Sequence, residues 1–311
     1  MERENLHYVY KLLNGRKLSA FEFINYFEKK VFKTIKRFNM LDLNDKVCVA
    51  VSGGKDSISV LYLIYKYMKK KNLEKNVFAL AIDEGIKHYR HKTLNYLKQF
   101  CLDYNIELYI ETYKKEYNKT QDENVFLLKQ KKLTISPCNI CGTFRRNILN
   151  KKSRELGATK LVTGHNLDDE SQSIMLNIFK NNFKILAKSG PINGVNENKL
   201  FVRRIKPLYF CTEKEVLLYT YLKKFEVKYD SCPYAKGQFR DEIANMLNKL
   251  EDNRKGVKFS IVNFFLEIEQ DLKQKYKQND SGFSKCSLCS EPTQKKICNT
   301  CEFKILVNDL K

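Results

Sequence analysis

The stretch "VCVAVSGGKDSISVLYLIY", from Val47 to Tyr65, decides the fold class of this chain. It opens with an apolar run typical of a buried strand, and an apolar pattern with helical spacing resumes after Asp56. Between the two lies "SGGKDS", Ser52 to Ser57. Glycines at such a corner let backbone N–H groups approach phosphate oxygens, and the start of the following helix favours negative charge. The corner therefore predicts a phosphate-binding loop. It is not a Walker A loop, because the GxxxxGK[ST] spacing is absent.

Further apolar runs alternate with helical patterns along the chain. Short, mostly apolar segments of this kind are typical of strands that are covered by helices on both faces. The alternation predicts an α/β fold with an open, mostly parallel sheet. The predicted strands are "KVCVAV" (46–51), "NVFALAID" (76–83), "IELYIETY" (106–113) and "TKLVTG" (159–164), and the helical patterns are 56–71, 90–104, 142–156 and 168–181.

The flanking regions read mainly as helical. A helix is predicted over 20–40, because apolar residues recur there at intervals of four. The lysine-rich stretch 113–136 is expected to be a mobile loop or a short helix, and Thr212 with Glu215 predicts a capping box that opens another helix. The predicted parts are an N-terminal helical arm (1–44), a catalytic domain (45–237), a helical segment (238–280) and a cysteine-rich module (281–311).

The net charge is the first guide to a partner. Lysine and arginine number 57 against 36 aspartates and glutamates in 311 residues, a formal charge of +21. Such an excess indicates a polyanionic partner, usually nucleic acid, or else reflects a lysine-rich proteome. The apolar content argues against global disorder, and no apolar run reaches the roughly 20 residues of a membrane span. We therefore expect a cytoplasmic protein without a membrane partner.

The cysteines are the second guide. Of the 10 in the chain, the last four follow the pattern Cys286-x2-Cys289-x8-Cys298-x2-Cys301. In a cytoplasmic chain such spacing indicates metal or redox chemistry rather than disulfides. Four thiolates in two knuckles are the donor set of a structural zinc site, whose binding energy folds a module too small to hold itself together. We therefore predict a four-cysteine zinc ribbon at the C-terminus.

Another pair, Cys138 and Cys141, lies in "PCNICGTFRR", and Cys232 lies in "SCPYAKGQF". Two cysteines cannot complete a four-coordinate zinc site, and Cys232 is the natural third ligand. Three cysteines leave one iron of a [4Fe–4S] cluster without a protein ligand. The alternative is a dithiol that undergoes redox chemistry or carries a persulfide. The residues alone leave both interpretations open.

The segment "LVTGHNLDDE" repeats the geometry of the first corner, with an apolar run, Gly164 and an acidic helix start. Asp168, Asp169 and Glu170 are favoured at a helix N-terminus by the helix dipole, so capping is one interpretation. Three carboxylates exceed what capping needs, however, and they suit Mg²⁺ or proton handling, which we favour. His165 alone is interpreted as a packed or hydrogen-bonded histidine.

Taken together, five motifs resemble those of one family. "SGGKDS" is similar to the PP-loop of the ATP pyrophosphatases, and it is followed by "PCNICG…RR", "TGHNLDDE", "CPYAKG" and the four-cysteine pattern. This ordered set resembles the tRNA uridine 2-sulfurtransferases, the TtuA/NcsA family, from about residue 20 to the C-terminus. The resemblance implies the α/β fold of the PP-loop ATP pyrophosphatases (the adenine nucleotide alpha hydrolase type). It also implies tRNA as the macromolecular substrate, which accounts for the basic surplus.

The resemblance further implies a role for each matching position. Asp169 would be the catalytic acidic residue, Arg145 would lie near the ATP phosphates, and Cys138 and Cys232 would take part in catalysis as cluster ligands. The implied ATP-binding residues are Ala50, Ser52, Gly53, Gly54, Lys55, Asp56, Ser57, Ile82, Arg145, Gly164 and Asp169. The implied metal ligands are Cys138, Cys141 and Cys232 for the [4Fe–4S] cluster and Cys286, Cys289, Cys298 and Cys301 for zinc.

The N-terminus departs from the family pattern. Family members typically begin with a second zinc module, whereas no cysteine precedes Cys48 in this chain. Ser19 and Glu22 stand where the last two zinc ligands would be. Either this zinc is lost, or the hydrophobic residues from Tyr8 to Leu18 take its place.

The implied chemistry is adenylation followed by sulfur attack. A uracil O2 is a poor leaving group, so ATP adenylates it, and AMP departs when sulfur attacks C2. The glycine loop and Mg²⁺ would hold the pyrophosphate, and a sulfide on the open iron of the cluster would be the nucleophile. The expected partners are tRNA, a ubiquitin-like sulfur carrier protein or free sulfide as the donor, and a second copy of the chain in a homodimer.

Two other functions are weighed against this one. A tRNA 2-thiocytidine synthetase shares the glycine loop and a cysteine-held cluster, but as a rule it lacks the terminal four-cysteine ribbon. A non-catalytic tRNA-binding scaffold of the same fold is the alternative from another class. The intact "SGGKDS" and "DDE" argue against a scaffold, because a decayed enzyme has no reason to retain both.

Overall fold

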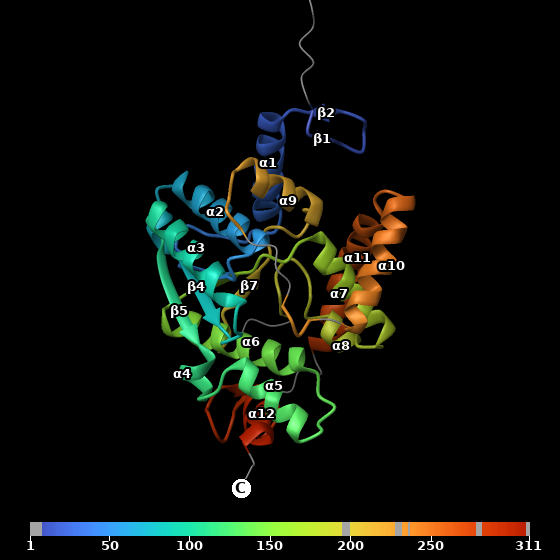
Figure 1. The fold of residues 1–311 in the computed structure, drawn as a ribbon. Coiled ribbons are helices and arrows are strands. Elements are labelled where there is room, and N and C mark those ends of the chain that lie inside the picture. Colours follow the sequence, from blue (N-terminus) through green and yellow to red (C-terminus); the bar gives the residue numbers. More distant parts are fainter. Residues whose placement is uncertain (1–7, 195–199, 228–231, 236, 278–281, 309–311) are drawn as a thin grey trace, which may run out of the picture.

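A five-stranded parallel sheet forms the centre of the computed structural model (Figure 1). The strand order is β5–β4–β3–β6–β7, and every neighbouring pair is parallel. The strands are β3 (Val47–Val51), β4 (Val77–Asp83), β5 (Glu107–Thr112), β6 (Lys160–Val162) and β7 (Arg203–Ile205). The first four confirm the predicted strands, whereas β7, with the sequence "RRI", is too short and too polar to be recognised. The structure describes residues 8–194, 200–227, 232–235, 237–277 and 282–308.

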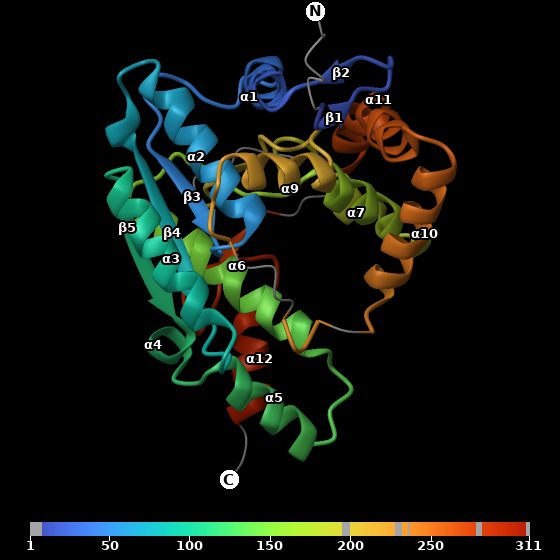
Figure 2. The ribbon, with the colours of Figure 1, turned by 45° about the horizontal axis from the view of Figure 1, so that its top comes forward.

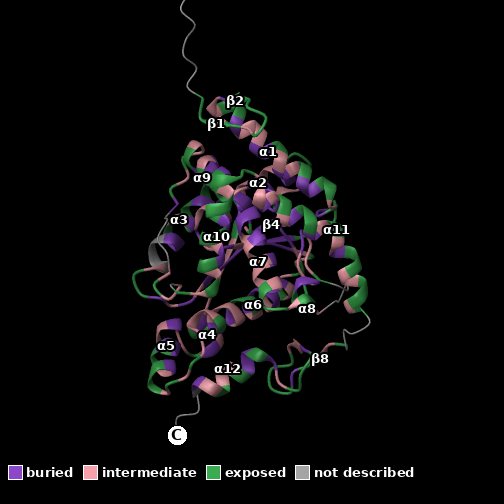
Figure 3. Ribbon diagram, turned by 90° about the vertical axis from the view of Figure 1, so that its right-hand side faces the viewer, coloured by how far each residue is buried: buried purple, intermediate pink, exposed green. Residues whose placement is uncertain are grey.

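Helices cover both faces of the sheet. One face carries α1 (Ala20–Arg37), α2 (Lys55–Lys69), α3 (Arg90–Asp103) and α9 (Glu213–Leu222). The other carries α4 (Tyr113–Tyr117), α5 (Gln121–Gln130), α6 (Pro137–Glu155) and α12 (Asn299–Asn308). Val47 and Val49 of β3 pack in the first core and Cys48 packs in the second, since side chains alternate along a strand. The central strand β4 is coloured mostly as buried in Figure 3. A short 3₁₀ helix, Glu74–Asn76, leads into β4.

A third group of helices packs beside the sheet, around its own apolar cluster (Figure 2). It consists of α7 (Leu167–Phe179), α8 (Phe183–Leu186), α10 (Phe239–Asn253) and α11 (Val257–Lys277). Ile174 of α7 and Val262 and Phe265 of α11 are fully buried in this cluster. Among the helices of the described residues, none combines the length and the apolar character needed to cross a membrane.

The N-terminal residues form a hairpin that leads into α1. In this hairpin β1 (Tyr10–Lys11) pairs with the antiparallel β2 (Lys17–Leu18). Ser19 caps α1 and Glu22 returns the bond, so the residues at the expected zinc-ligand positions form a reciprocal capping box. The predicted helix α1 packs its apolar face against α2 and α9. It is therefore part of the main core rather than a separate arm.

The C-terminal module has a similar shape. β8 (Ser284–Lys285) pairs with the antiparallel β9 (Pro292–Thr293), and α12 follows. Val307 of α12 is buried in the core beneath α6, and Arg154 of α6 forms an ion pair with Glu291 at 2.6 Å. The ribbon is thus attached to the rest of the protein by apolar and polar contacts, which include the hydrogen bond from Lys131 Nζ to the Leu306 carbonyl (2.7 Å).

One prediction of local structure needs correction, and two others are confirmed. Helix α6 begins at Pro137, five residues before the predicted start, because proline is well suited to the first turn of a helix. Cys138 therefore lies in that first turn, and Cys141 lies at the start of the second. The stretch 113–136 contains the helices α4 and α5, so its short-helix interpretation is confirmed. The capping box of Thr212 and Glu215 is confirmed at the start of α9.

Candidate active site

The corner "SGGKDS" leads from β3 into α2, and its own hydroxyl groups fix its backbone. The Ser57 hydroxyl accepts a hydrogen bond from the Ser52 N–H (3.1 Å) and donates one to the Gly54 carbonyl (2.9 Å). Gly53 has a φ of +77°, and a Cβ there would lie 2.7 Å from the backbone oxygen of Thr93, so only glycine fits. No side chain caps the helix at Gly54. The start of α2 is therefore open to an anionic group.

Lys55 is held between two carboxylates. Its Nζ lies 2.9 Å from Asp56 and 2.9 Å from Glu213 at the start of α9. Burial by itself lowers the pKa of Lys55, but the two carboxylates raise it above its ordinary value. The ammonium group is therefore charged at physiological pH. Glu213 keeps 55% of its side chain exposed, so a polyphosphate at the corner can replace it as the partner of Lys55.

A second corner, at the end of β6, touches the first. A Cβ on Gly164 would lie 3.0 Å from the backbone C and O of Asp56, so glycine allows this close approach. The Asn166 amide donates a hydrogen bond to Asp56 Oδ1 (2.9 Å). Asn166 also caps α7 in a reciprocal box with Asp169. The two corners predicted from sequence are therefore joined at the carboxyl edge of the adjacent strands β3 and β6, where open α/β sheets bind ligands.

The three acidic residues at the start of α7 have different partners. Asp168 is buried and forms an ion pair with Lys258 of α11. Glu170 is buried and forms an ion pair with Lys206 at 2.8 Å. These two carboxylates are neutralised by buried lysines and hold α7 in place. The interpretation of all three acids as a metal or proton site is therefore wrong for Asp168 and Glu170, and Asp169 is the carboxylate that faces the corner.

Asp169 meets a cation from α10. Its Oδ1 lies 2.9 Å from the Arg240 guanidinium, and its side chain is 35% exposed. Burial among protein atoms raises the pKa of Asp169, while the charge of Arg240 opposes this shift. His165 is exposed to solvent, and its Nδ1 lies 2.9 Å from the Thr163 hydroxyl. Desolvation lowers the pKa of His165 to about 4.

Arg145 of α6 lies on the other side of the corners, towards β4. Its guanidinium is 3.9 Å from Glu84, which is buried directly after β4. Burial by itself lowers the pKa of Arg145, but Glu84 and its other anionic neighbours raise it. Ala50 near the end of β3 is half-buried, and Ile82 near the end of β4 is buried. The residues expected to bind ATP thus come from β3, β4, β6 and α6 and lie along one edge of the sheet.

Three cysteines from distant parts of the sequence lie near one another; we call Cys138, Cys141 and Cys232 the cysteine trio. Cys138 Sγ lies 3.4 Å from the carbonyl of Tyr234, two residues after Cys232. The Tyr113 hydroxyl donates to the Cys141 carbonyl (2.7 Å) and lies 3.5 Å from its Sγ. Burial raises the pKa of each thiol of the trio, and a neighbouring member raises it further. All three thiols are partly exposed.

The start of α10 connects the trio to the second corner. Gln238 accepts a hydrogen bond from the hydroxyl of Ser136, which precedes the first turn of α6 (3.2 Å). Two residues later, Arg240 contacts Asp169. The trio and the two glycine corners therefore form one site, although four separate segments of the chain contribute to it.

The spacing of the trio differs from that of a zinc site. Among the described residues, one set of three or more potential metal ligands has its ligand atoms all within 4.8 Å of one another, and it is the C-terminal four. Zinc binds sulfur at about 2.3 Å, so its ligands lie close together. The trio is more widely spaced, as three ligands of a cluster with several irons are. Its donor set and its partial exposure fit a [4Fe–4S] cluster.

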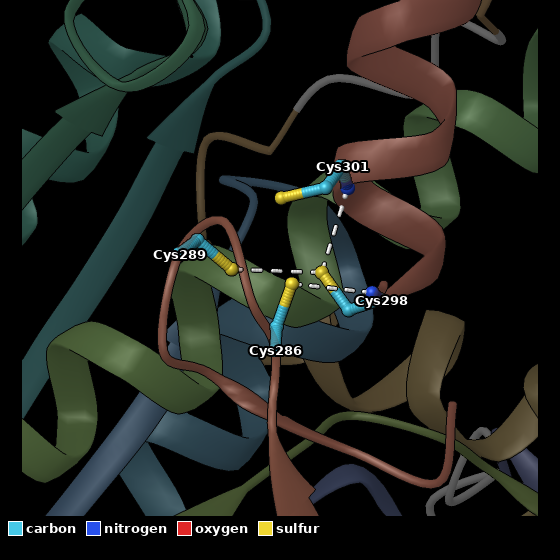
Figure 4. Close-up of side chains that lie close together, drawn as sticks. All are labelled: Cys286, Cys289, Cys298 and Cys301. Carbon is cyan, nitrogen blue, oxygen red and sulfur yellow. Dashed lines mark hydrogen bonds between the residues drawn. The ribbon is translucent and has the colours of Figure 1, made fainter. Parts of the chain in front are cut away.

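The C-terminal cysteines point towards a common centre (Figure 4). Cys286 and Cys289 belong to the hairpin, and Cys298 and Cys301 lie at the start of α12. The N–H groups of Leu288 and Cys298 donate to Cys286 Sγ at 3.5 and 3.3 Å. Although burial raises the pKa of Cys286, these backbone hydrogen bonds lower it to about 6. The four sulfur atoms and their N–H donors fit a single tetrahedral zinc ion.

Sequence reasoning missed several charged residues of the site. Glu84 follows a predicted strand directly, so its position at the carboxyl edge of the sheet is a signal that could have found it. Glu213 and Arg240 reach the site from α9 and α10, and no local pattern places those helices beside the corners. Their roles follow from tertiary packing alone.

Comparisons with known proteins agree with this geometry. The family model described as a PP-loop domain matches residues 25–250. The chain is 34% identical to the tRNA-5-methyluridine(54) 2-sulfurtransferase of Pyrococcus horikoshii, over 90% of this chain and 85% of that protein. It is 31% identical to the tRNA 2-thiolation protein NcsA of Haloferax volcanii, over 88% of each. The structure of the U34-tRNA thiolase NcsA from Methanococcus maripaludis with its [4Fe-4S] cluster matches with a TM-score of 0.78 and 32% identity. That match covers 98% of this chain and 95% of the other.

The chain belongs to the tRNA 2-thiolation sulfurtransferases. The family that the five motifs indicate is thereby confirmed, as are the PP-loop α/β fold and an enzymatic function in tRNA thiolation. This sulfurtransferase has tRNA as its substrate class. Its N-terminus differs from the expected family pattern, because a capping box and a packed hairpin occupy the place of a zinc module.

Proposed function

We propose that this sulfurtransferase converts a uridine of tRNA to 2-thiouridine in two steps. The uracil O2 first attacks the α-phosphorus of ATP, which forms the O2-adenylate and releases pyrophosphate. A sulfide sulfur then attacks C2, the C2–O bond breaks, and AMP leaves with the oxygen. The observation that carries this proposal is the single site in which two joined glycine corners and the cysteine trio lie beside each other.

The first corner is suited to the polyphosphate. The uncapped start of α2 and the charged Lys55 offer positive charge where pyrophosphate develops, and the glycines let phosphate oxygens reach backbone N–H groups. Asp56 and Asp169, joined through Asn166, offer carboxylate oxygens of the kind that Mg²⁺ prefers. We assign Asp169 as the catalytic acidic residue, because it is the carboxylate of α7 that faces the corner. Ala50, Ile82 and Gly164 complete the ATP site, with Arg145 near its phosphates.

The trio is suited to sulfur transfer. Cys138, Cys141 and Cys232 would hold a [4Fe–4S] cluster, which supplies an iron with an open coordination position. The relative from Methanococcus maripaludis carries such a cluster, which supports this assignment. Tyr113 donates a hydrogen bond to the backbone of Cys141 and orients the first turn of α6. The four C-terminal cysteines would hold zinc for structure rather than for chemistry.

The decisive experiment separates the two halves of the site. Protein reconstituted anaerobically should carry about four irons, and alanine substitution of Cys138, Cys141 or Cys232 should abolish both the cluster and thiolation. ATP should still bind to these variants, because the corner at Ser52 is a separate structure. Asp169→Ala should keep the cluster and lose activity. The matched control is Cys101→Ala, which removes a buried thiol of α3 and should change neither.

Two results would change this proposal. Robust thiolation by iron-free protein would mean that a persulfide on the Cys138–Cys141 dithiol, rather than the cluster, delivers the sulfur. The adenylation step of the proposal would be unaffected. If Asp169→Ala loses thiolation activity but still binds ATP, tRNA and the cluster, Asp169 takes part in the reaction itself. Full activity of that variant would refute its catalytic role. Thiolated nucleosides are measured by mass spectrometry of digested tRNA.

The partners follow from the same family. We propose a wobble or T-loop uridine as the target, since the relatives' names include both U34 and position 54. Mass spectrometry of tRNA from cells with and without the gene, mapped to position, distinguishes them.

We further propose a cytoplasmic location, in line with relatives named cytoplasmic tRNA 2-thiolation protein 1. A ubiquitin-like carrier or free sulfide would be the sulfur donor, and reconstitution of thiolation with each donor tests this. A homodimer is expected, and light scattering measures the oligomeric state.

A further inference from the structure

Two arginines on the α6 side of the sheet have no carboxylate partner in the described part of the chain. They are Arg146 of α6 and Arg204 of β7, and we call them the arginine pair. The other arginines of the site are neutralised, since Arg145 lies beside Glu84 and Arg240 contacts Asp169. The side chain of Arg146 makes one long hydrogen bond of 3.5 Å, to the hydroxyl of Thr143.

Arg146 is directed towards the trio. A Cβ on Gly142 would lie 3.2 Å from Arg146 Nη1, so the guanidinium folds back over Gly142 towards the first turn of α6. It lies near enough to Cys141 and Arg145 for their charges to act on it. Gly142 therefore leaves the space that the Arg146 guanidinium needs beside the trio.

Arg204 faces the same helix from the sheet. It is in register with Leu161 of β6, which packs in the core beneath α6, as does Val202 two residues earlier. Residues in register on parallel strands point to the same face, and so do residues two apart on one strand. The charge of Arg146 lowers the pKa of Arg204, and the charge of Arg204 contributes to the lowered pKa of His165. The Val202 N–H donates to Asn150 Oδ1 (3.1 Å), one turn after Arg146 on α6, so Arg204 lies near Arg146 on this face of the sheet.

Arg146 is exposed and Arg204 is half-buried, so two neighbouring positive charges without a carboxylate partner are accessible to an incoming anion. Burial and the charge of Arg146 lower the pKa of Arg204 to about 10, and burial and the charge of Arg145 lower that of Arg146. Both groups nevertheless carry their charge at neutral pH. The arrangement is therefore that of an anion site.

We propose that the arginine pair binds a backbone phosphate of the substrate RNA beside the nucleotide that is thiolated. This inference rests on the proposed function and names a subsite of it. The triphosphate of ATP already has a place at the corner after β3, whereas β7 lies beyond β6 on the side away from β4. A guanidinium group can donate two parallel hydrogen bonds to the oxygens of one phosphate.

The consequence for the reaction is positional. When the C2 atom of a uracil lies at the trio, the backbone phosphate of the same nucleotide lies about one nucleotide's length away. The residues that hold the strand must therefore lie at that distance from the trio. Phosphate contacts fix the register of a nucleic acid without reading its sequence. Arg146 and Arg204 are therefore positioning residues, and they touch the RNA backbone rather than the reacting atoms.

The test measures the affinity for an unmodified tRNA transcript at several salt concentrations. Arg146→Ala and Arg204→Ala should each weaken binding roughly tenfold and lower the salt slope by about one, as the loss of one phosphate contact does. Arg204→Lys keeps the charge and should retain most of the affinity. The double alanine variant should lose less than the product of the two single losses, because both side chains would grip one phosphate.

A matched control separates this site from net charge. Arg254 is exposed, and it lies at the far end of α10, about 21 Å along the helix from Arg240. Arg254→Ala also removes one positive charge, yet it should change tRNA affinity far less. The dissociation constant for a non-hydrolysable ATP analogue should stay unchanged in all these variants. Zinc content and the melting temperature report whether each variant is folded.

The other outcomes overturn the inference in distinct ways. Weaker binding of the ATP analogue with unchanged tRNA affinity would assign the pair to the nucleotide. An increased KM for sulfide with both affinities unchanged would assign it to the sulfur donor. Equal effects of Arg204→Ala and Arg254→Ala, in a wild-type enzyme that thiolates tRNA, would refute the inference alone. A wild-type protein without thiolation activity would instead refute the proposed function. If Arg204→Ala does not fold, Arg146→Ala and Arg204→Lys decide.

Discussion

At each end of the chain a two-stranded antiparallel hairpin leads into a helix, β1–β2 into α1 and β8–β9 into α12. The two modules are held in different ways. At the N-terminus, the ring of Tyr10 lies 4.9 Å from that of Phe23, and its hydroxyl donates to Glu215 of α9 (3.3 Å). At the C-terminus, the small buried cluster inside the ribbon consists of its own cysteines with Ile297 packed against them.

The difference shows what a small hairpin needs in order to fold. The N-terminal hairpin precedes a helix with many aromatic side chains, and it can bury Leu18 and Tyr10 against a core that already exists. The ribbon has no comparable apolar surface between its strands, so metal ligation must supply the stabilisation. The N-terminal hairpin is therefore held by packing, whereas the C-terminal hairpin is expected to be held by a metal ion bound to its thiolates.

The largest effect is expected from removing a zinc ligand. Cys298→Ser should abolish zinc binding and unfold the ribbon, since structural zinc contributes an apparent 10–16 kcal/mol in small zinc modules, as an order of magnitude. Amide hydrogen exchange should become fast at the ribbon and stay slow in α1. Zinc analysis should find about one ion per chain in the wild type and none in the variant. Loss of protection in α1 would show that the two modules are coupled.

The second effect tests the packing of the N-terminal module. Phe23 is fully buried and Phe21, on the same helix, is 76% exposed. Phe23→Ala should lower the free energy of unfolding by about 3–5 kcal/mol, because it removes buried apolar contacts and leaves a cavity. Phe21→Ala should change it by less than about 0.5 kcal/mol. Urea denaturation measures both, and zinc content should be unchanged in both. Similar losses in the two variants would contradict a packed hairpin.

A smaller effect is expected from one hydrogen bond of the hairpin. Tyr10→Phe removes the hydroxyl that contacts Glu215 but keeps the ring against Phe23. The free energy of unfolding should fall by about 1 kcal/mol. Tyr8→Phe is the control, because Tyr8 is 51% exposed and should have no measurable effect. A loss of several kcal/mol in Tyr10→Phe would mean that the hydroxyl, rather than the ring, holds the hairpin.

The smallest effect concerns the capping box that takes the place of zinc ligands. Hydrogen bonds from the Ser19 backbone and side chain lower the pKa of Glu22 below its ordinary value of 4.5. A carboxylate whose folded-state pKa is lowered stabilises the fold above its unfolded pKa, and this contribution is lost as the pH falls through the folded pKa. Glu22→Gln should therefore melt slightly below the wild type at pH 7. The two melting curves should converge below pH 4. A constant difference across this range would contradict the assignment.

Much of the fold was accessible from sequence because its signals are local. The run "VCVAV" followed by two glycines predicts a strand and a phosphate corner, since buried strands are apolar and tight turns need glycine. The spacing from Cys286 to Cys301 predicts a metal knuckle for the same reason, because neighbouring residues supply all the ligands. The capping box at Thr212 also lies within four residues. Each signal is complete within a short segment.

Tertiary structure alone decided which of the acidic side chains faces the site. Asp168, Asp169 and Glu170 are alike in sequence, yet Lys258 and Lys206 neutralise the outer two from distant segments, and Asp169 alone faces the corner. The strand β7 was not predicted, because three residues are too few to show a periodicity. The position of Arg204, which lies on this strand, was therefore not predicted either. Partner choice and exposure depend on which helices pack together, and this is fixed by the summed burial of many side chains rather than by any local pattern. The sequence by itself therefore determined the chemistry that is present, while the folded structure determined which residues can use it.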